Sequence, residues 1–319
     1  MFSTIVRVSA RLECGILAHG FLRLRCGDCG HDKLLAFSCK RRGFCPSCGA
    51  RRMSQTAAHL VDHVIPHVPV RQWVLSLPIP LRLLLAAQPE LVTPVLQVVH
   101  RVITRHLLGQ AGLKAEEADS GAVTLIQRFG SAANLNIHLH CLVLDGVYRR
   151  GADGVPEFVE VPAPTDEALQ SVLHKIITRT MKLLTRRGVL VEEEGSTYMA
   201  DNDGDSDEAR TLRPLHAAAC TYRIAFGPRA GQKVLTVQGV MPRDADFKQT
   251  LCADSHGFSL HAAVRCGADD RQALEQLCRY ITRPALANER VQTNAAGQVV
   301  LKLKTPWRDG TTHLVMSPL

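Results

Sequence analysis

The chain has 319 residues, of which 46% are hydrophobic and 21% are charged. This length suits one large globular domain or two smaller ones with ample hydrophobic core. The longest apolar runs, such as residues 83–87, are far too short to span a bilayer, and no secretion signal opens the chain. We therefore expect a cytoplasmic protein that has no membrane partner.

Lysine and arginine outnumber the acidic residues by 38 to 30, which gives a formal net charge of +8. The surplus is concentrated in residues 23–52, where eight basic residues stand against two acidic ones. Such a local surplus is typical of a surface that contacts the phosphate backbone of nucleic acid. The residues expected to make these contacts are Lys40, Arg41, Arg42, Arg51 and Arg52.

The same segment carries two Cys-x-x-Cys pairs that are separated by fifteen residues. Each pair can place two thiolates on one ion, and two pairs complete the tetrahedral site that zinc prefers. Gly30 and Gly49, each one residue past the second cysteine of a pair, suit the turn that closes that pair. Because we expect a reducing compartment, metal ligation is favoured over disulfide formation. Cys39 and His31 are less favoured substitute ligands. The predicted ligands of this structural zinc ion are Cys26, Cys29, Cys45 and Cys48.

Hydrophobic periodicity and turn residues divide the remaining chain into helices and strands. Helices are expected at residues 50–65, 89–108, 166–187, 211–226 and 271–282, with Thr165 and either Asp269 or Asp270 as N-caps. Strands are expected at residues 72–80, 122–129, 234–237, 258–264, 299–304 and 312–316, the last two as a closing hairpin. The acidic residues 192–210 are expected to form a solvated linker or insertion, because they lack the spacing of a calcium loop.

The stretch 134–148 contains two histidines in the alternating pattern of a strand. Successive side chains of a strand point to opposite faces, so His138 and His140 share one face, and apolar residues such as Ile137 and Leu139 share the other. Two such imidazoles can reach one divalent metal ion if another element supplies a further ligand. An ordinary half-buried strand fits the same pattern. The short connection 130–134 predicts pairing with residues 122–129 as a hairpin.

Tyr280 is the tyrosine, among four, whose position suits a reaction at such a metal. It lies roughly 60° beyond Leu277 on its helix, at the edge of the apolar stripe, so its hydroxyl can point outward. A phenol needs an electrophilic target or a stabilised oxyanion to act as a nucleophile. A metal on the two histidines would activate a phosphodiester, and Arg283 would neutralise the phosphate. A tyrosine at a core margin with a hydrogen-bonded hydroxyl is the alternative interpretation.

Three stretches together resemble rolling-circle transposases of the insertion-sequence 91 group. Residues 127–148 are similar to their His-hydrophobe-His (HUH) strand, and residues 26–52 are similar to their N-terminal zinc-binding domain. Residues 278–284, Cys-Arg-Tyr-Ile-Thr-Arg-Pro, match the neighbourhood of their catalytic tyrosine. The three stretches occur in the family's order and extend over most of the chain.

The resemblance implies an HUH single-strand DNA endonuclease and transferase that acts in rolling-circle transposition. His138 and His140 would hold Mg²⁺ or Mn²⁺, and Tyr280 would form a 5′-phosphotyrosine link while Arg283 contacts the phosphate. The implied fold is α+β, with a four-cysteine zinc-ribbon-like domain ahead of an HUH domain built on a central antiparallel sheet flanked by helices. The implied partner is single-stranded DNA at transposon ends and target, in the bacterial nucleoid.

The chain departs from this family pattern in two respects. Relatives with two catalytic tyrosines carry Tyr-x-x-x-Tyr, whereas Gln276 occupies the first of these positions here. The chain therefore resembles the single-tyrosine, common-region-like subgroup. Relatives also continue past the closing hairpin, so we expect a truncated C-terminus. The third metal ligand stays open between Gln127 and Gln276.

The expected domains are a zinc-binding, DNA-binding unit at residues 1–65 and an HUH endonuclease unit at residues 66–319. Two other functions stay open. One is a catalytically inactive or truncated protein that binds DNA through its zinc domain. The other is a replication initiator or relaxase with the same tyrosine chemistry, although the zinc-binding pairs ahead of the catalytic part argue against it.

Overall fold

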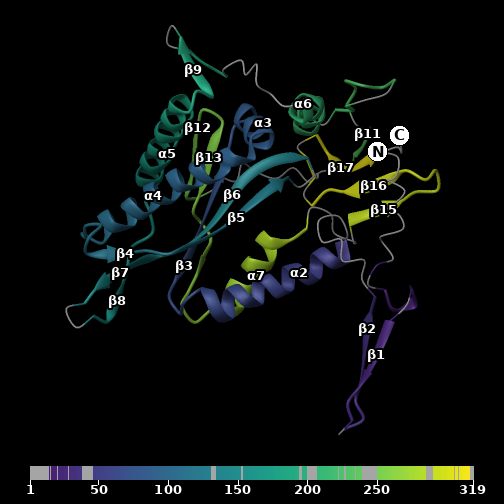
Figure 1. Cartoon of the computed structure of the whole chain (residues 1–319), viewed down its shortest axis with the longest axis horizontal. Coiled ribbons are helices and arrows are strands. Elements are labelled where there is room, and N and C mark those ends of the chain that lie inside the picture. Colours follow the sequence, from purple (N-terminus) through teal and green to yellow (C-terminus); the bar gives the residue numbers. More distant parts are fainter. Residues whose placement is uncertain are drawn as a thin grey trace.

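The computed structural model describes residues 14, 16–19, 21–27, 29–37, 46–130, 134–151, 154–193, 196–199, 207–221, 223–225, 228–233, 235–238, 250–284, 290–304, 306–307 and 309–316. These residues form antiparallel sheets with helices packed against them (Figure 1). The predicted α+β class is therefore confirmed.

The largest sheet is built around the strand that carries the two histidines. This strand, β6 (Leu135–Leu144), lies between β5 (Ala122–Phe129) and β3 (Val70–Ser76), and all three are antiparallel. The predicted hairpin of β5 and β6 is confirmed, and its register places Gln127 opposite His138. The remaining strands of this sheet are β13 (Phe258–His261), β12 (Cys252–Ser255) and β14 (Arg265–Cys266).

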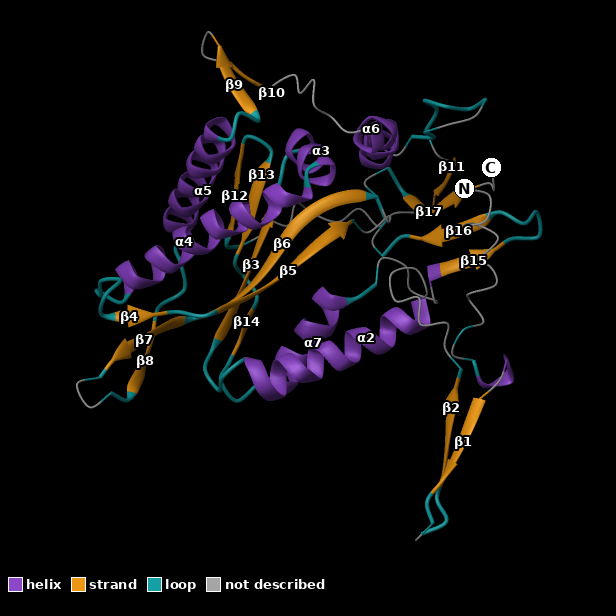
Figure 2. Cartoon of the chain, viewed as in Figure 1, coloured by secondary structure: helices purple, strands orange, loops and turns teal. Residues whose placement is uncertain are grey.

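One face of this sheet packs against α3 (Ile79–Ala87), α4 (Val92–Gln110) and α5 (Asp166–Arg186) (Figure 2). The apolar side chains that alternate with the histidines on β6, such as Ile137 and Leu139, are fully buried there. The side chain of Thr165 accepts a hydrogen bond from the amide of Ala168, which confirms the predicted N-cap of α5.

Within the described part of the chain, no single helix is long and apolar enough to cross a membrane. The segment Ile79–Ala87 and the segment Pro89–Gln110 pass a test of length and composition only as a pair, which is bent by 111°.

The opposite face of the sheet is covered by α2 (Pro46–His59) and α7 (Arg271–Thr282), which lie side by side (Figure 1). The helix α2 continues into a π-helical turn, η2 (Leu60–Val64). Apolar residues from α2, η2, α7 and β6 form one buried cluster. The prediction of a helix at residues 271–282 is confirmed, and Asp270 caps it through the amide of Ala273. Because His138 and His140 lie on this face, they lie beneath α7.

Smaller sheets and helices surround this core. The predicted closing hairpin is confirmed as β16 (Val299–Lys302) and β17 (Thr311–Met316). The acidic stretch 192–210 contains the end of β9 (Leu190–Glu193), all of β10 (Ser196–Met199) and the start of α6 (Asp207–Thr221), while residues 194–195 and 200–206 lie outside the described part. The other elements are η1 (Leu17–His19), β1 (Phe21–Arg25), β2 (Asp32–Ala36), η3 (Pro89–Leu91), β4 (Ala118–Asp119), β7 (Gly146–Arg150), β8 (Pro156–Glu160), β9 (Leu190–Glu193), β10 (Ser196–Met199), α6 (Asp207–Thr221), β11 (Leu235–Gln238) and β15 (Val291–Thr293).

The strand predicted at residues 72–80 ends earlier than expected, because its prolines begin a helix. β3 ends at Ser76, and α3 starts at Ile79 with Pro78 as its N-cap residue and Pro80 in its first turn. Proline is tolerated in the first turn of a helix, where its missing N–H would have no intrahelical partner. The two prolines therefore start α3 instead of only ending β3.

Candidate active site

The two histidines of β6 and the tyrosine of α7 lie close together in the fold. The ring centroids of His138 and His140 are 4.8 Å apart. The ring of Tyr280 approaches that of His140 edge-on, with the two centroids 6.4 Å apart. Residues that are 140 positions apart in the sequence thus meet because α7 packs on the histidine-bearing face of the sheet.

Hydrogen bonds fix the orientation of both imidazole rings. Nδ1 of His138 lies 2.8 Å from the backbone oxygen of Asn136, so it donates to that oxygen and leaves Nε2 as the ring's electron-pair donor. Nδ1 of His140 lies 2.8 Å from the side-chain amide of Gln72. Rotating that amide by a half turn would present its oxygen to Nδ1 and leave Nε2 of His140 unprotonated.

Nε2 of His140 is the atom that best indicates a bound ion. It is buried, and it has no hydrogen-bond partner among the described residues. A buried polar atom of this kind is costly unless something binds it. Nε2 of His138 is the ligating atom expected on the neighbouring ring, so the donor set fits a divalent cation.

The surroundings keep both imidazoles neutral. Burial, with smaller contributions from His138 and Arg283, lowers the pKa of His140 to about 3. Burial also lowers the pKa of His138, with smaller contributions from Arg82 and Arg283 that oppose the effect of its bond to Asn136. A neutral imidazole is the form that binds a metal ion.

Two cations contact the ring of Tyr280. The guanidinium carbon of Arg283 lies 4.5 Å from the ring centroid, and Nζ of Lys304 lies 4.0 Å from it. Both distances are typical of cation–π contacts. Tyr280 is 41% exposed, so a substrate can reach it. Together these cations form a positively charged site next to the phenol.

Gln127 joins the histidine strand to the tyrosine helix. It lies opposite His138 in the β5–β6 register and is only 5% exposed. Its Nε2 donates to the backbone oxygen of Ile281 over 3.3 Å, which leaves its amide oxygen for another partner. Gln276, the other residue considered as a third ligand, is exposed on α7.

The described cysteines of the predicted zinc site lie in two different places. Cys26 and Cys29 are exposed in the turn between β1 and β2, where Gly30 has a φ of +69° and donates its N–H to Cys26. Cys48 is buried in the first turn of α2, which Figure 1 shows away from the tip of that hairpin. Gly49, which follows Cys48, is helical instead of forming a second turn. Cys45 lies outside the described residues.

No group of three or more metal-binding side chains is found among the residues that the structure describes. The described N-terminal segment has one hairpin followed by a helix, instead of the two hairpin turns of a zinc ribbon. Sγ of Cys14, a cysteine outside the two Cys-x-x-Cys pairs, lies 3.7 Å from Sγ of Cys48. Two thiolates on one tetrahedral zinc ion are separated by about 3.8 Å, for bonds of about 2.3 Å.

Among the predicted nucleic-acid contacts, Arg51 and Arg52 are exposed on α2. Lys40, Arg41 and Arg42 lie outside the described residues. Sequence reasoning missed three residues of the tyrosine site: Gln72, Arg82 and Lys304. Gln72 shares one face of β3 with Val70 and Val74, and the strand pattern shows this face but not which strand lies beside it.

Comparison with known proteins identifies the class of this fold and site. The family described as "Putative transposase" matches residues 121–319, which include β5, β6 and α7. The family described as "Transposase zinc-binding domain", of the insertion-sequence 91 type, matches residues 3–77. Searches of curated proteins and of solved structures gave no match.

The chain is thus a transposase, because the transposase family covers more than half of its length. With both matches in the same order, it belongs to the insertion-sequence 91 family. Membership implies a DNA-processing enzyme that binds DNA, with a zinc-binding domain within residues 3–77.

Proposed function

We propose that this transposase nicks single-stranded DNA with Tyr280 and transfers the strand through a 5′-phosphotyrosine intermediate. The observation that carries this proposal is the position of Tyr280, whose ring lies beside His140 and contacts two cations. A structural tyrosine at a core margin has no need of two neutral imidazoles, one buried and one half-buried, or of two cations against its ring.

In the proposed step, the phenol oxygen of Tyr280 attacks the phosphorus of a phosphodiester. An O–P bond forms to the tyrosine, and the bond between phosphorus and the 3′ oxygen breaks. The phenol proton passes to solvent, which reaches the 41% exposed Tyr280, and the departing 3′ oxygen takes a proton from solvent to give a free 3′-OH. Arg283 and Lys304 balance the negative charge of the phosphate. The energy of the broken bond is kept in the phosphotyrosine, so rejoining to another 3′-OH needs no ATP.

His138 and His140 would hold Mg²⁺ or Mn²⁺, with the amide oxygen of Gln127 as the third protein ligand. A bound divalent ion would supply a Lewis acid that draws charge from the non-bridging phosphate oxygens. Gln127 would also position the nucleophile, because its amide nitrogen holds the last turn of α7 through Ile281.

The N-terminal part is proposed to bind DNA around a structural zinc ion. Its proposed ligands are Cys26, Cys29, Cys45 and Cys48, with Cys14 as a further candidate because its Sγ lies 3.7 Å from that of Cys48. The proposed contacts to phosphate come from Lys40, Arg41, Arg42, Arg51 and Arg52. In this proposal residues 1–65 act in DNA binding and residues 66–319 act as the endonuclease. The division is one of function and not of packing, because apolar residues within 57–65 are buried in one cluster with α7. We propose that the chain belongs to the single-tyrosine subgroup, because Gln276 occupies the position of a second tyrosine.

A covalent-adduct assay tests the nucleophile. Purified protein with Mn²⁺ is incubated with single-stranded oligonucleotides from the ends of the element, labelled 3′ of the expected nick, and analysed by denaturing electrophoresis. We expect labelled protein, which Tyr280→Phe abolishes. Tyr148→Phe is the matched control, because Tyr148 packs against Phe158 with ring centroids 5.1 Å apart.

The outcomes separate the alternative functions. Equal labelling of wild type and Tyr280→Phe refutes the assignment of the nucleophile. Zinc-dependent DNA binding without an adduct under any metal would identify an inactive DNA-binding protein instead. Adducts formed with a plasmid origin but not with element ends would identify a replication initiator or relaxase.

A further inference from the structure

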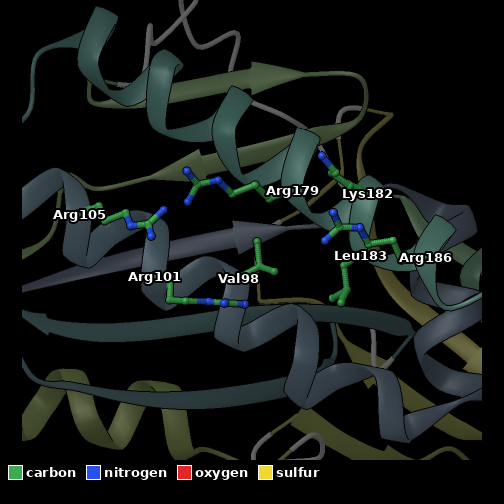
Figure 3. A pocket seen from close by; sticks show the side chains of 7 residues that line it. All are labelled: Val98, Arg101, Arg105, Arg179, Lys182, Leu183 and Arg186. Atoms are coloured by element: carbon green, nitrogen blue, oxygen red, sulfur yellow. The ribbon is translucent and has the colours of Figure 1, made fainter.

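A groove between α4 and α5 carries a dense positive charge that the proposed nicking site does not use. The cavity has a volume of about 350 Å³, and Val98 and Leu183 are its apolar lining residues. All five of its other lining side chains are cationic and exposed, and they enter the space from both helices (Figure 3). They are Arg101 and Arg105 of α4, and Arg179, Lys182 and Arg186 of α5.

Within the described part of the chain, no acidic side chain forms an ion pair with any of these five cations. Arg101 donates a hydrogen bond to the backbone of its own helix, which leaves its charge unneutralised. α4 contains no acidic residue, and those of α5 are confined to its first turn. Arg179 lies about 18 Å along the helix axis from that turn, at 1.5 Å per residue.

The spacing of the cations fits a series of phosphates. Lys175, Arg179, Lys182 and Arg186 recur at intervals of four, three and four residues, which places them along one face of α5. The row from Arg179 to Arg186 extends about 10 Å, or roughly three nucleotides at 3.4 Å each. Like charges at this spacing repel one another, so a bound polyanion would stabilise the groove by neutralising them.

We propose that the groove between α4 and α5 binds the phosphate backbone of duplex DNA that flanks the nicked strand. This inference rests on the proposed DNA-processing function. The lining residues include no aromatic side chain on which an unpaired base could stack, so the groove suits sequence-independent contact with a backbone. It lies on the face of the central sheet opposite α7 (Figure 1).

The position of the groove sets a minimum length for the DNA. The groove is separated from Tyr280 by the sheet and by one layer of helices, and a helix layer alone is about 10–12 Å thick. A duplex arm must therefore pass around the sheet, which needs on the order of 10 base pairs, or about 34 Å. An arm of five base pairs should not reach the groove, whereas an arm of 20 base pairs should.

The test compares the triple variant Arg179→Gln, Lys182→Gln and Arg186→Gln with wild type. Binding is measured by fluorescence anisotropy over a range of salt concentrations, with a single-stranded oligonucleotide and with forked DNA that carries a 5- or 20-base-pair arm. The matched control removes the same charge from exposed positions elsewhere: Lys114→Gln, Arg149→Gln and Arg150→Gln.

We expect the groove variant to bind forked DNA with the 20-base-pair arm at least tenfold more weakly than wild type does. Its affinity for the single-stranded oligonucleotide should equal that of wild type. The slope of log K against log salt for that arm should fall by about 2–3, at about 0.9 per lost phosphate contact. Thermal melting of the variant should match wild type, because all three side chains are exposed.

Three results would overturn the proposal. The first is an unchanged affinity of the groove variant for DNA with the 20-base-pair arm. The second is an equal loss of its affinity for the single-stranded oligonucleotide. The third is an equal loss of affinity for the 20-base-pair arm in the control variant. The second would assign the groove to single-stranded DNA, and the third to net charge alone. Since the readout is binding and not adduct formation, a failure of the nicking proposal would leave this test informative.

Discussion

The buried ion pair between Arg71 and Asp145 gives the sharpest prediction about stability. Arg71 is 3% exposed and Asp145 is 2% exposed. Nε and Nη2 of Arg71 lie 2.8 and 2.9 Å from the two carboxylate oxygens, while Nη1 donates to Ala262 over 3.0 Å. Asp145 also accepts from Arg265 over 2.7 Å. One carboxylate thus joins β3, β14 and the β6–β7 junction.

Asp145→Asn keeps the size of the side chain but leaves the charge of Arg71 buried without a counterion. Breaking a buried pair in this way costs about 3–5 kcal/mol, because the remaining charge stays desolvated. Replacing both partners with apolar residues, Arg71→Met with Asp145→Leu, removes that charge as well. We therefore expect the double variant to be more stable than Asp145→Asn by at least about 2 kcal/mol.

The assay is urea unfolding followed by tryptophan fluorescence at fixed salt and zinc concentrations. The chain has two tryptophans, so a Trp307→Phe background leaves Trp73 as the only reporter. Trp73 is 1% exposed and lies two residues from Arg71 on β3. The reasoning is refuted if Asp145→Asn costs less than about 1 kcal/mol, or if the double variant is the less stable of the two.

Three further predictions concern thiols, zinc and glycines. Burial raises the pKa of Cys278 to about 11, so its thiol should stay protonated at pH 8 and resist maleimide in the native protein. Labelling of Cys278 should occur only when the pH approaches this pKa or when the protein is unfolded. The Cys14→Ser variant should lose zinc to a chelator faster than the Cys252→Ser variant in a colorimetric assay, because Sγ of Cys14 lies 3.7 Å from Sγ of Cys48. Equal rates would exclude Cys14 as a ligand. Gly146→Ala should lower the melting temperature, since a Cβ there would lie 2.3 Å from a backbone oxygen. Gly109→Ala, which has open space in α4, should raise it by reducing the entropy of the unfolded chain, and a shift of the same sign in both variants would contradict this account.

The elements that sequence could predict are those whose signals are local. Residues 271–282 form α7 with the predicted bounds, because a capping aspartate directly precedes the segment and an apolar stripe lies within it. The β5–β6 hairpin follows from two adjacent alternating runs and a short connection. The same alternation is enough to put His138 and His140 on one face of their strand.

The parts that sequence could not predict depend on distant neighbours. Lys304 reaches Tyr280 from the loop that follows β16, and Arg82 approaches the histidines from α3. No pattern near either residue indicates its partner. Local rules also gave the wrong result at Gly49, where a glycine after a cysteine suggested a turn but the backbone is helical. Glycine permits a turn without requiring one.

The packing of α2 has a consequence for how such a protein can be divided or recombined. Ala57, Leu60, Val61 and Ile65 precede residue 66, yet they are buried in the same cluster as Ile281 of α7. A chimera in which a foreign DNA-binding domain replaced residues 1–65 would lack these side chains, and the apolar surface that they cover would be exposed. The interchangeable part therefore has to end before α2, so that this helix stays with the catalytic body.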